Sequence, residues 1–435
     1  MQLIKTILVA VLTLESRLIL RKYKPFIVAV TGSVGKTSTK DAIYCVLKDQ
    51  SKLVRKSEKS MNSEIGLPLT IIGMPNAWHS LEGWLKNLTH GLSLILWKNE
   101  YPDCLILEIG ADHPNDIKKV AKWLKPDVAV MTKISRLPVH VEFFRSAEEV
   151  FEEKAALAMA VKNGGTLILA ADDNKVMSLA GRVKEKNIQV ISYGKSDMST
   201  IQGLDGATDY NAITKAPIGF GFTIKSGGDS IPVKIKNVAG ETYMYPLLAA
   251  AAVAKARNLS VESIGKSLSE YEAPKGRMNL IAGINGSTII DDTYNSSPDA
   301  ASSALATLKS LQCSGTKIAV LGDMMELGKF SAEAHRQIGQ ECLGSADYLI
   351  TVGPRSNMTA EEAQKSSLSS SMIHSFDTSS EAAAFIVPEV KTGDIVLVKG
   401  SQSMRMERVV KALLKEPEKV DKLLVRQEKE WLEKA

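Results

Sequence analysis

Short apolar runs alternate with segments of helical period along the first half of the chain. The runs that suit buried strands lie at 28–30, 104–109, 127–132, 165–170 and 190–193. They are rich in β-branched and aliphatic residues and have the length of strands rather than helices. Strands that alternate with helices in this way predict an α/β fold, with a mostly parallel sheet covered by helices on both faces.

The pattern changes at 196–238, where glycines separate short β-like segments, and this predicts an antiparallel flap on the first sheet. An alanine-rich helix is expected at 245–255. After Ala273-Pro-Lys-Gly276 a second α/β series begins, with strands expected at 287–290, 317–321, 348–352 and 394–398. The last twenty residues are charged and helical in pattern, which is typical of a solvated face.

The N-terminal segment is apolar from Ile4 to Leu20, but three charged residues interrupt it, namely Lys5, Glu15 and Arg17. It is too short and too charged for a membrane span, and no signal-peptide cleavage pattern follows. Two interpretations stay open: a helix packed on the domain, or a helix on the inner face of a membrane beside Arg21, Lys22 and Lys24. The region of Trp78, Trp84 and Trp97 either adds to such a surface or belongs to the core.

The composition is that of an ordinary soluble protein with two or three domains: 435 residues, 44% of them hydrophobic and 24% charged. A net charge of +5 gives no case for nucleic-acid binding, although an anionic substrate is compatible with it. The four cysteines have no CxxC spacing, which indicates reduced thiols in a cytoplasmic protein rather than a zinc site.

The strongest motif is Thr31-Gly-Ser-Val-Gly-Lys-Thr-Ser38, which lies between a predicted strand and a predicted helix. Such a glycine-rich turn cradles phosphates with backbone N–H groups at the positive end of the helix. The side chain of Lys36 is expected to reach the β- and γ-phosphates, and the hydroxyl of Thr37 to hold Mg²⁺. The nucleotide-binding residues expected here are Gly32, Ser33, Gly35, Lys36, Thr37 and Ser38. The alternative is a plain glycine turn with an exposed lysine.

Two further candidates follow the next predicted strands, where an α/β sheet presents its ligands. Glu108 ends one strand and is suited to complete a Mg²⁺ shell beside the phosphates. His140 lies in the loop after the following strand and is a candidate for a second metal ligand. Taken alone, each also fits a simpler role, as a solvated acid and a structural histidine.

A series of motifs makes the chain resemble the Mur ligases from about Pro25 to Leu414, and in particular the type that adds D-alanyl-D-alanine to UDP-N-acetylmuramoyl-tripeptide (the MurF type). Besides the phosphate loop, the motifs are, in order, Asn62-Ser-Glu-Ile-Gly-Leu-Pro-Leu69, Glu108-Ile-Gly110, His140-Val-Glu-Phe-Phe144, Glu153-Lys-Ala-Ala-Leu157, Gly276-Arg277, Asp291-Asp-Thr-Tyr-Asn-Ser-Ser-Pro298, Val320-Leu-Gly-Asp-Met-Met-Glu-Leu-Gly328 and Val398-Lys-Gly-Ser401.

The resemblance implies an ATP-dependent ligase that converts a carboxylate into an acyl phosphate, which an amine then attacks to form an amide. It implies two Mg²⁺ ions, with Thr37 and Glu108 on one and His140 on the other. Lys154 matches a lysine that CO₂ carbamylates in this family, which makes it a metal-binding carboxylate analogue. The catalytic residues implied are Lys36, Lys154 and His140.

The resemblance also assigns nucleotide contacts outside the loop. Asn62 matches a residue near the metal and phosphates, whereas Arg277 and Asp292 match positions that contact nucleotide phosphate and ribose. Tyr294 and Asn295 are expected to shape the same cleft. The pattern departs from the family at Gly240-Glu-Thr-Tyr-Met-Tyr-Pro246, where a His-Asn pair is expected near adenine, so the adenine contacts must differ.

The expected architecture is therefore an N-terminal apolar helix (1–24), a central P-loop ATPase domain (25–275) and a Rossmann-like C-terminal domain (276–435). The expected substrates are a UDP-muramoyl peptide and D-Ala-D-Ala, and the expected location is the cytoplasm or the inner membrane face. Only 24 residues precede Pro25, whereas this type of ligase has an N-terminal UDP-binding domain, so the UDP site is left unassigned. Two alternatives remain: a related ligase of the folylpolyglutamate or poly-γ-glutamate type, and a non-catalytic nucleotide-binding protein. The oligomeric state is left open.

Overall fold

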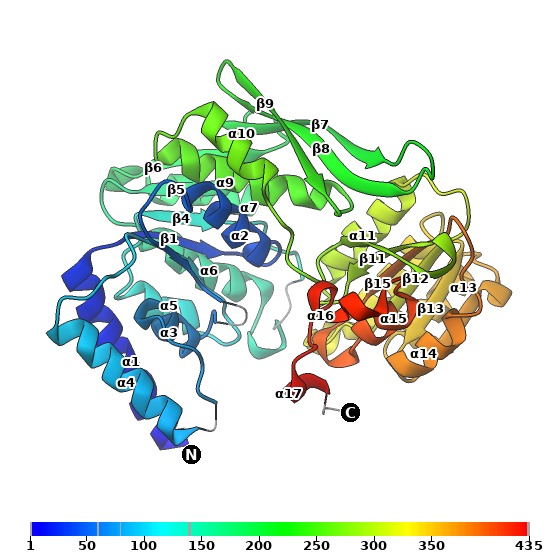
Figure 1. Ribbon diagram of the computed structural model, residues 1–435, viewed down its shortest axis with the longest axis horizontal. Coiled ribbons are helices and arrows are strands. Elements are labelled where there is room, and N and C mark those ends of the chain that lie inside the picture. Colours follow the sequence, from blue (N-terminus) through cyan, green and yellow to red (C-terminus); the bar gives the residue numbers. More distant parts are fainter. Residues whose placement is uncertain (1, 59–60, 79, 138–140, 433–435) are drawn as a thin grey trace.

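The computed structural model describes residues 2–58, 61–78, 80–137 and 141–432 (Figure 1). Its described strands form two sheets, one of nine strands built from the first half of the chain and one of six from the second. The α/β fold expected from the hydrophobic pattern is confirmed.

The first sheet has the strand order β2-β3-β1-β4-β5-β6-β7-β8-β9. Neighbouring strands are parallel from β2 to β7, and β7, β8 and β9 form the antiparallel flap that the glycine-punctuated pattern predicted. The strands are β1 (Phe26–Thr31), β2 (Val54–Lys56), β3 (Cys104–Glu108), β4 (Val128–Met131), β5 (Thr166–Ala170), β6 (Gln189–Gly194), β7 (Ile201–Tyr210), β8 (Pro217–Ser226) and β9 (Asp229–Lys236).

Helices cover both faces of this sheet. In Figure 1, α2 (Lys36–Leu47), α9 (Met244–Ala256) and α10 (Val261–Ser269) lie on one side, and α3 (Gly66–Ile72), α5 (Asp116–Ala121) and α6 (Ala147–Met159) on the other. The alanine-rich helix α9 packs against both α2 and the sheet. Its small side chains allow this close approach, and Met244 and Pro246–Ala254 are buried. The short helices α7 (Asn174–Met177) and α8 (Leu179–Arg182) follow β5.

The N-terminal segment forms one helix, α1 (Gln2–Tyr23), which packs beside α4 (Leu81–Leu96) on the outer flank of the first sheet (Figure 1). Leu12, Ser16 and Ile19 of α1 are fully buried against the domain. The Lys22 ammonium donates hydrogen bonds to the carbonyls of Leu94 (2.8 Å) and Ile95 (3.0 Å), which favourably caps the negative end of α4. No helix in the described part of the chain has the length and apolar character needed to cross a membrane.

The second sheet has the order β10-β11-β15-β12-β13-β14, with β10 antiparallel and the rest parallel. Its strands are β10 (Asn279–Ala282), β11 (Thr288–Asp292), β12 (Lys317–Gly322), β13 (Tyr348–Val352), β14 (Ile373–Phe376) and β15 (Ile395–Lys399). The accompanying helices are α11 (Pro298–Ser310), α12 (Ser331–Cys342), α13 (Asn357–Lys365), α14 (Ser379–Ile386) and α15 (Glu407–Leu413).

The end of the chain differs from the expected solvated helical face. It contains two single-turn helices, α16 (Val420–Leu423) and α17 (Lys429–Leu432), and between them Leu424–Arg426 is buried. The Arg426 guanidinium donates to Glu407 Oε2 (2.9 Å) and to the carbonyl of Thr293 (3.1 Å). The expectation was wrong here because a charged segment can bury an arginine that finds a carboxylate partner.

One buried carboxylate lies where α1 and α4 meet. A Cβ at Gly91 of α4 would overlap the carboxylate of Glu15, so a larger residue there would displace this side chain. Glu15 Oε2 has no hydrogen-bond partner among the described residues, and burial raises the pKa of Glu15 to about 7.

This predicts that Glu15→Gln stabilises the protein at high pH only. Between pH 4.5 and 7 the folded state retains a proton that the unfolded state has lost, so stability falls as pH rises. The amide cannot ionise, and we expect its apparent Tm to exceed that of the parent by roughly 2–4 °C at pH 8 and to match it at pH 4. Thermal unfolding by circular dichroism measures this, with the exposed Glu185→Gln as control. A parent Tm that does not fall relative to the variant between these pH values contradicts the prediction.

Candidate active site

The phosphate loop lies between the end of β1 and the start of α2. Gly32 has φ of 146°, and a Cβ there would overlap the Thr132 hydroxyl that follows β4. Gly35, at the N-cap of α2, has the left-handed conformation (φ 82°). Both positions therefore favour glycine because of their positive φ, and at Gly32 a side chain would also have no space. The loop is held at the carboxyl end of β1, directly before the positive end of the twelve-residue helix α2.

Two hydroxyl groups beside this loop are buried without a hydrogen-bond partner among the described residues. The N–H groups of Ser33 and Val34 donate to the carbonyl of Lys133 (2.9 and 3.3 Å), which fixes the loop against the β4 end. Ser33 Oγ and Thr132 Oγ1 have no hydrogen-bond partner among the described residues. A buried unpaired polar atom costs about 1–3 kcal/mol. These hydroxyls therefore fit a polar ligand, and nucleotide phosphate is the one that the loop geometry suits.

The lysine of the loop is folded back on its own backbone. Its ammonium donates to the carbonyls of Gly32 (3.0 Å) and Ser33 (3.3 Å). Burial lowers the pKa of Lys36, while the charge of Glu108 opposes that shift. A phosphate anion placed in the loop would supply the counter-charge that this desolvated lysine lacks.

Thr37 and Glu108 meet as expected. Thr37 Oγ1 donates to Glu108 Oε1 across 3.2 Å, and oxygen atoms of this kind are the ligands that Mg²⁺ prefers. Asn62 lies against Gly110, whose N–H donates to the Asn62 carbonyl (3.1 Å), so it too lies close to the end of β3. The sequence-based grouping of these three residues around one site is consistent with the structure.

A second lysine of α2 positions Glu108, and the motif analysis missed it. Lys40 is buried one turn after Lys36, and its ammonium lies 3.9 Å from Glu108 Oε2 and donates to the Ser57 carbonyl (2.8 Å). The Ser57 hydroxyl in turn accepts from the N–H of Glu108 (3.1 Å). The available signal was the four-residue spacing from Lys36, which places both lysines on one face of the helix.

Lys154 projects from α6 into the same region. Burial lowers the pKa of Lys154 to about 7, and the charge of Lys36 lowers it further, whereas Asp112 and Glu153 raise it. Glu153 itself caps α5, because its carboxylate accepts from the N–H groups of Asn115 (3.0 Å) and Lys118 (2.8 Å). Asp112 acts on the pKa of both Lys36 and Lys154 and was not among the expected site residues.

His140 lies outside the described residues. Within the described ranges, no three histidine, cysteine, aspartate or glutamate side chains converge on a metal-sized site. The oxygen pair of Thr37 and Glu108 therefore remains the described part of the expected metal shell.

The second domain contributes Arg277 to the site. Its guanidinium stacks over the Tyr294 ring at 4.1 Å, and its charge lowers the pKa of Lys36, so it lies within electrostatic reach of the loop. Asp292 is instead paired internally: Lys399 Nζ donates to its Oδ2 (2.6 Å), and also to the Asn295 carbonyl (2.9 Å). Ribose contact by Asp292 or Asn295 stays a prediction.

The segment 240–246, which departs from the family pattern, contacts residues of the second domain. Tyr243 of the turn Glu241–Tyr243 donates from its hydroxyl to the Arg277 carbonyl, and Val238 pairs with Asn279 in a β-bridge. A Cβ at Gly240 would overlap the Thr307 hydroxyl of α11. The residues that replace the expected His-Asn pair thus help to fix Arg277.

Two family models match the chain: the Mur ligase middle domain matches residues 30–82 and 85–254, and the Mur ligase glutamate ligase domain matches 276–402. The chain belongs to the Mur ligase family. The phosphate loop, Glu108 and Lys154 fall within the first match, and Arg277 within the second.

Among relatives of this Mur ligase, the UDP-N-acetylmuramoyl-tripeptide--D-alanyl-D-alanine ligase of Bacillus subtilis is 28% identical, over 90% of this chain and 76% of that protein. The enzyme of the same name from Haemophilus influenzae is 27% identical, over 90% and 77%. Among solved structures, MurF ligase from Thermotoga maritima in complex with ADP has a TM-score of 0.75 and 26% identity, over 95% of this chain and 84% of that one.

The site predicts that Lys36→Ala weakens ATP binding without unfolding the protein. A charge-assisted hydrogen bond to phosphate contributes about 1.5–3 kcal/mol, so the Kd should rise by roughly ten- to a hundredfold. Tm should not fall, because the desolvated lysine is already disfavoured in the charged form. Isothermal titration calorimetry measures the Kd, and Lys48→Ala, at the far end of α2, is the matched control. Equal affinity in parent and Lys36→Ala would remove this lysine from the phosphate site.

Proposed function

We propose that this Mur ligase uses ATP to join D-alanyl-D-alanine to the tripeptide of a UDP-N-acetylmuramoyl precursor in peptidoglycan synthesis. The observation that carries the proposal is the cluster at the carboxyl edge of the first sheet, where the phosphate loop, the Thr37–Glu108 pair and Lys154 gather. The named relatives support the substrate assignment, since they align over nine-tenths of the chain.

The proposed reaction has two steps, and negative charge on phosphate must be stabilised in each. The peptide carboxylate attacks the γ-phosphorus of ATP to give an acyl phosphate and ADP, and the amine then attacks the acyl carbon and expels phosphate. Lys36 neutralises the transferred phosphoryl group, and Arg277 adds a second positive charge from the C-terminal domain. Lys40 lies beside the Glu108 carboxylate and helps to hold it toward Thr37.

Mg²⁺ suits the oxygen donors of Thr37 and Glu108, where it would offset phosphate charge, and His140 is proposed for a second ion. We also propose that Lys154 is carbamylated. Its neutral amine adds to CO₂ to form a carbamate and release one proton, which turns a cation into a carboxylate-like ligand. The support is physical: a pKa of about 7 leaves roughly half of the amine neutral near pH 7.

With the proposed division into domains at 275/276, both domains contribute residues to the nucleotide site. Gly328, in the loop after β12, packs against the Cβ of Glu142 in the central domain, so the two domains touch across this side of the site. Asn62, Asp292 and Asn295 are proposed nucleotide contacts between the two domains.

The test is a phosphate-release assay with a panel of acceptors and amines. We expect ADP and phosphate only when a UDP-muramoyl tripeptide and D-Ala-D-Ala are both present, with the amide product identified by mass spectrometry. Turnover with a folyl or poly-γ-glutamyl acceptor and glutamate instead would assign the related ligase class. Failure of every pair in a protein that binds ATP would favour a non-catalytic role.

Lys154→Ala should be nearly inactive, and acetate or formate should partly restore its activity by occupying the place of the carbamate. Labelling with ¹³CO₂ should give a carbamate resonance in the parent that the variant lacks, while the exposed Lys184→Ala behaves as the parent. An active parent without that resonance contradicts the modification and leaves the ligase assignment standing.

A further inference from the structure

The outer side of α1 exposes a continuous row of large apolar side chains. Leu3 and Ile4 are 73% and 72% exposed, and the row follows at intervals of three or four residues with Ile7, Val11, Leu14 and Leu18. This spacing keeps the row on one face of the helix. The opposite face carries Leu12, Ser16 and Ile19 into the domain, so α1 is both packed and half uncovered.

Helix α4 exposes a second row, formed by Leu81, Leu85, Leu92 and Leu96. The two helices touch where Glu15 lies against Gly91. The two rows therefore lie on helices that contact each other, and together they make up the exposed apolar surface of this helix pair. Trp78 and Trp97, 74% and 63% exposed, precede and follow α4. We call this surface the α1–α4 face.

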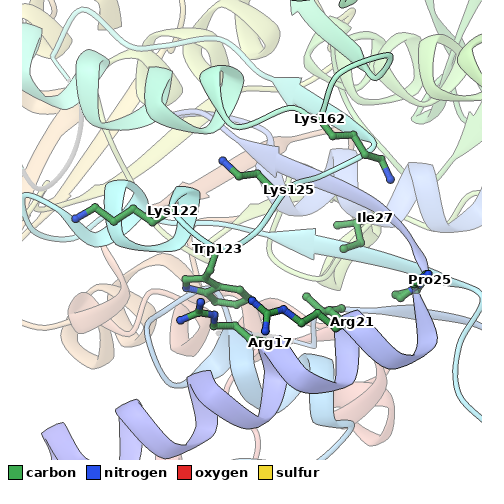
Figure 2. Close-up of a pocket in the computed structure, with 10 residues that line it drawn as sticks. Arg17, Arg21, Pro25, Ile27, Lys122, Trp123, Lys125 and Lys162 are labelled. Carbon is green, nitrogen blue, oxygen red and sulfur yellow. The ribbon is translucent and has the colours of Figure 1, made fainter.

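A basic pocket lies beside the C-terminal half of α1 (Figure 2). Its volume is about 510 Å³, and its lining contains no acidic residue; the basic residues are Arg17, Arg21, Lys24, Lys122, Lys125 and Lys162. Figure 2 shows Arg17 and Arg21 on α1 beside Trp123. Lys162 pairs with Asp127, while the other five have no ion pair among the described residues. Such a concentration of positive charge fits a phosphate-bearing ligand.

The pocket is separate from the nucleotide site. Ile27 lies at the start of β1, Lys125 precedes β4, and Lys162 precedes β5, which places the pocket at the amino ends of these parallel strands. The phosphate loop lies at their carboxyl ends. The six residues of β1 separate the two by about 20 Å.

We infer that the α1–α4 face and the basic pocket together form a docking site for an anionic phospholipid bilayer. The apolar rows enter the boundary between headgroups and acyl chains, the exposed tryptophans lie at headgroup level, and the pocket binds lipid phosphate. Charge complementarity favours this occupant over a second copy of the chain, whose matching pocket would be equally positive. The two rows supply an apolar contribution and the pocket an electrostatic one, the combination that stable attachment requires.

The test is flotation of the full-length protein with vesicles of phosphatidylcholine alone and with 30% phosphatidylglycerol. We expect binding to the anionic vesicles only. Each basic residue near such a surface contributes roughly fivefold in partitioning, so Arg17→Gln/Arg21→Gln should lower it by about 25-fold. Ile7→Ser/Leu14→Ser should also lower it at least tenfold. The matched controls are Lys184→Gln/Lys266→Gln and the exposed flap substitution Ile213→Ser, which should bind as the parent does.

Three results would overturn the inference: no flotation with anionic vesicles, equal flotation of the parent and both test variants, or a parent dimer that Ile7→Ser/Leu14→Ser converts to monomer. Titration with inorganic phosphate distinguishes a small-anion site, since phosphate binding without vesicle binding also rejects a bilayer. Because vesicle binding is measured without turnover, its failure is independent of the ligase assay. ATP affinity, unchanged in the test variants, confirms that they remain folded.

Discussion

The proximity of two desolvated lysines governs the chemistry of this protein. Lys154 is buried and Lys36 is partly buried, each has a lowered pKa, and the charge of Lys36 further lowers the pKa of Lys154. Two ammonium groups close together in a low-dielectric site repel each other, which raises the free energy of the folded protein. The repulsion is relieved when negative charge enters the site or when one amine loses its proton. Nucleotide phosphate supplies negative charge beside Lys36, and a carbamate at Lys154 would replace the second ammonium with an anion. The same electrostatic demand therefore favours both substrate binding and modification.

Strand register brings the opposing charges to this point. In the parallel sheet, Val30 of β1 is paired with Glu108 of β3, and Thr31 is paired with Met131 of β4. The residues that follow these strands emerge at one edge, where Glu108 reaches Thr37 and Thr132 packs on Gly32. A slip of one residue in the pairing of β3 with β1 would point Glu108 to the other face of the sheet. The geometry of the site is thus a consequence of buried apolar strands that carry no chemistry themselves.

Sequence patterns predicted the buried strands and the contiguous motifs, because a strand covered on both faces needs an unbroken apolar run. They missed β2, β10 and β14, which are all edge strands and contain charged or polar residues such as Arg55 and His374. The roles of Lys40 and Asp112 were missed for a different reason. Each depends on segments distant in sequence approaching in the fold; the spacing of Lys40 from Lys36 indicates a shared helix face but not the contact with Glu108. The burial of Arg426 similarly depends on Glu407, nineteen positions away.

The two ends of the parallel strands in the first sheet carry different sites: one for ATP and one for the proposed membrane attachment. The carboxyl ends of the strands hold the phosphate loop, near Arg277 of the C-terminal domain, whereas the basic pocket lies at the amino ends beside α1. In Figure 1 the second domain lies across the molecule from α1 and α4. A bilayer bound through the α1–α4 face would leave the contact of Gly328 with Glu142 uncovered. Helix α1 also lies outside both matched family regions, so attachment through it can vary without altering the residues that handle ATP.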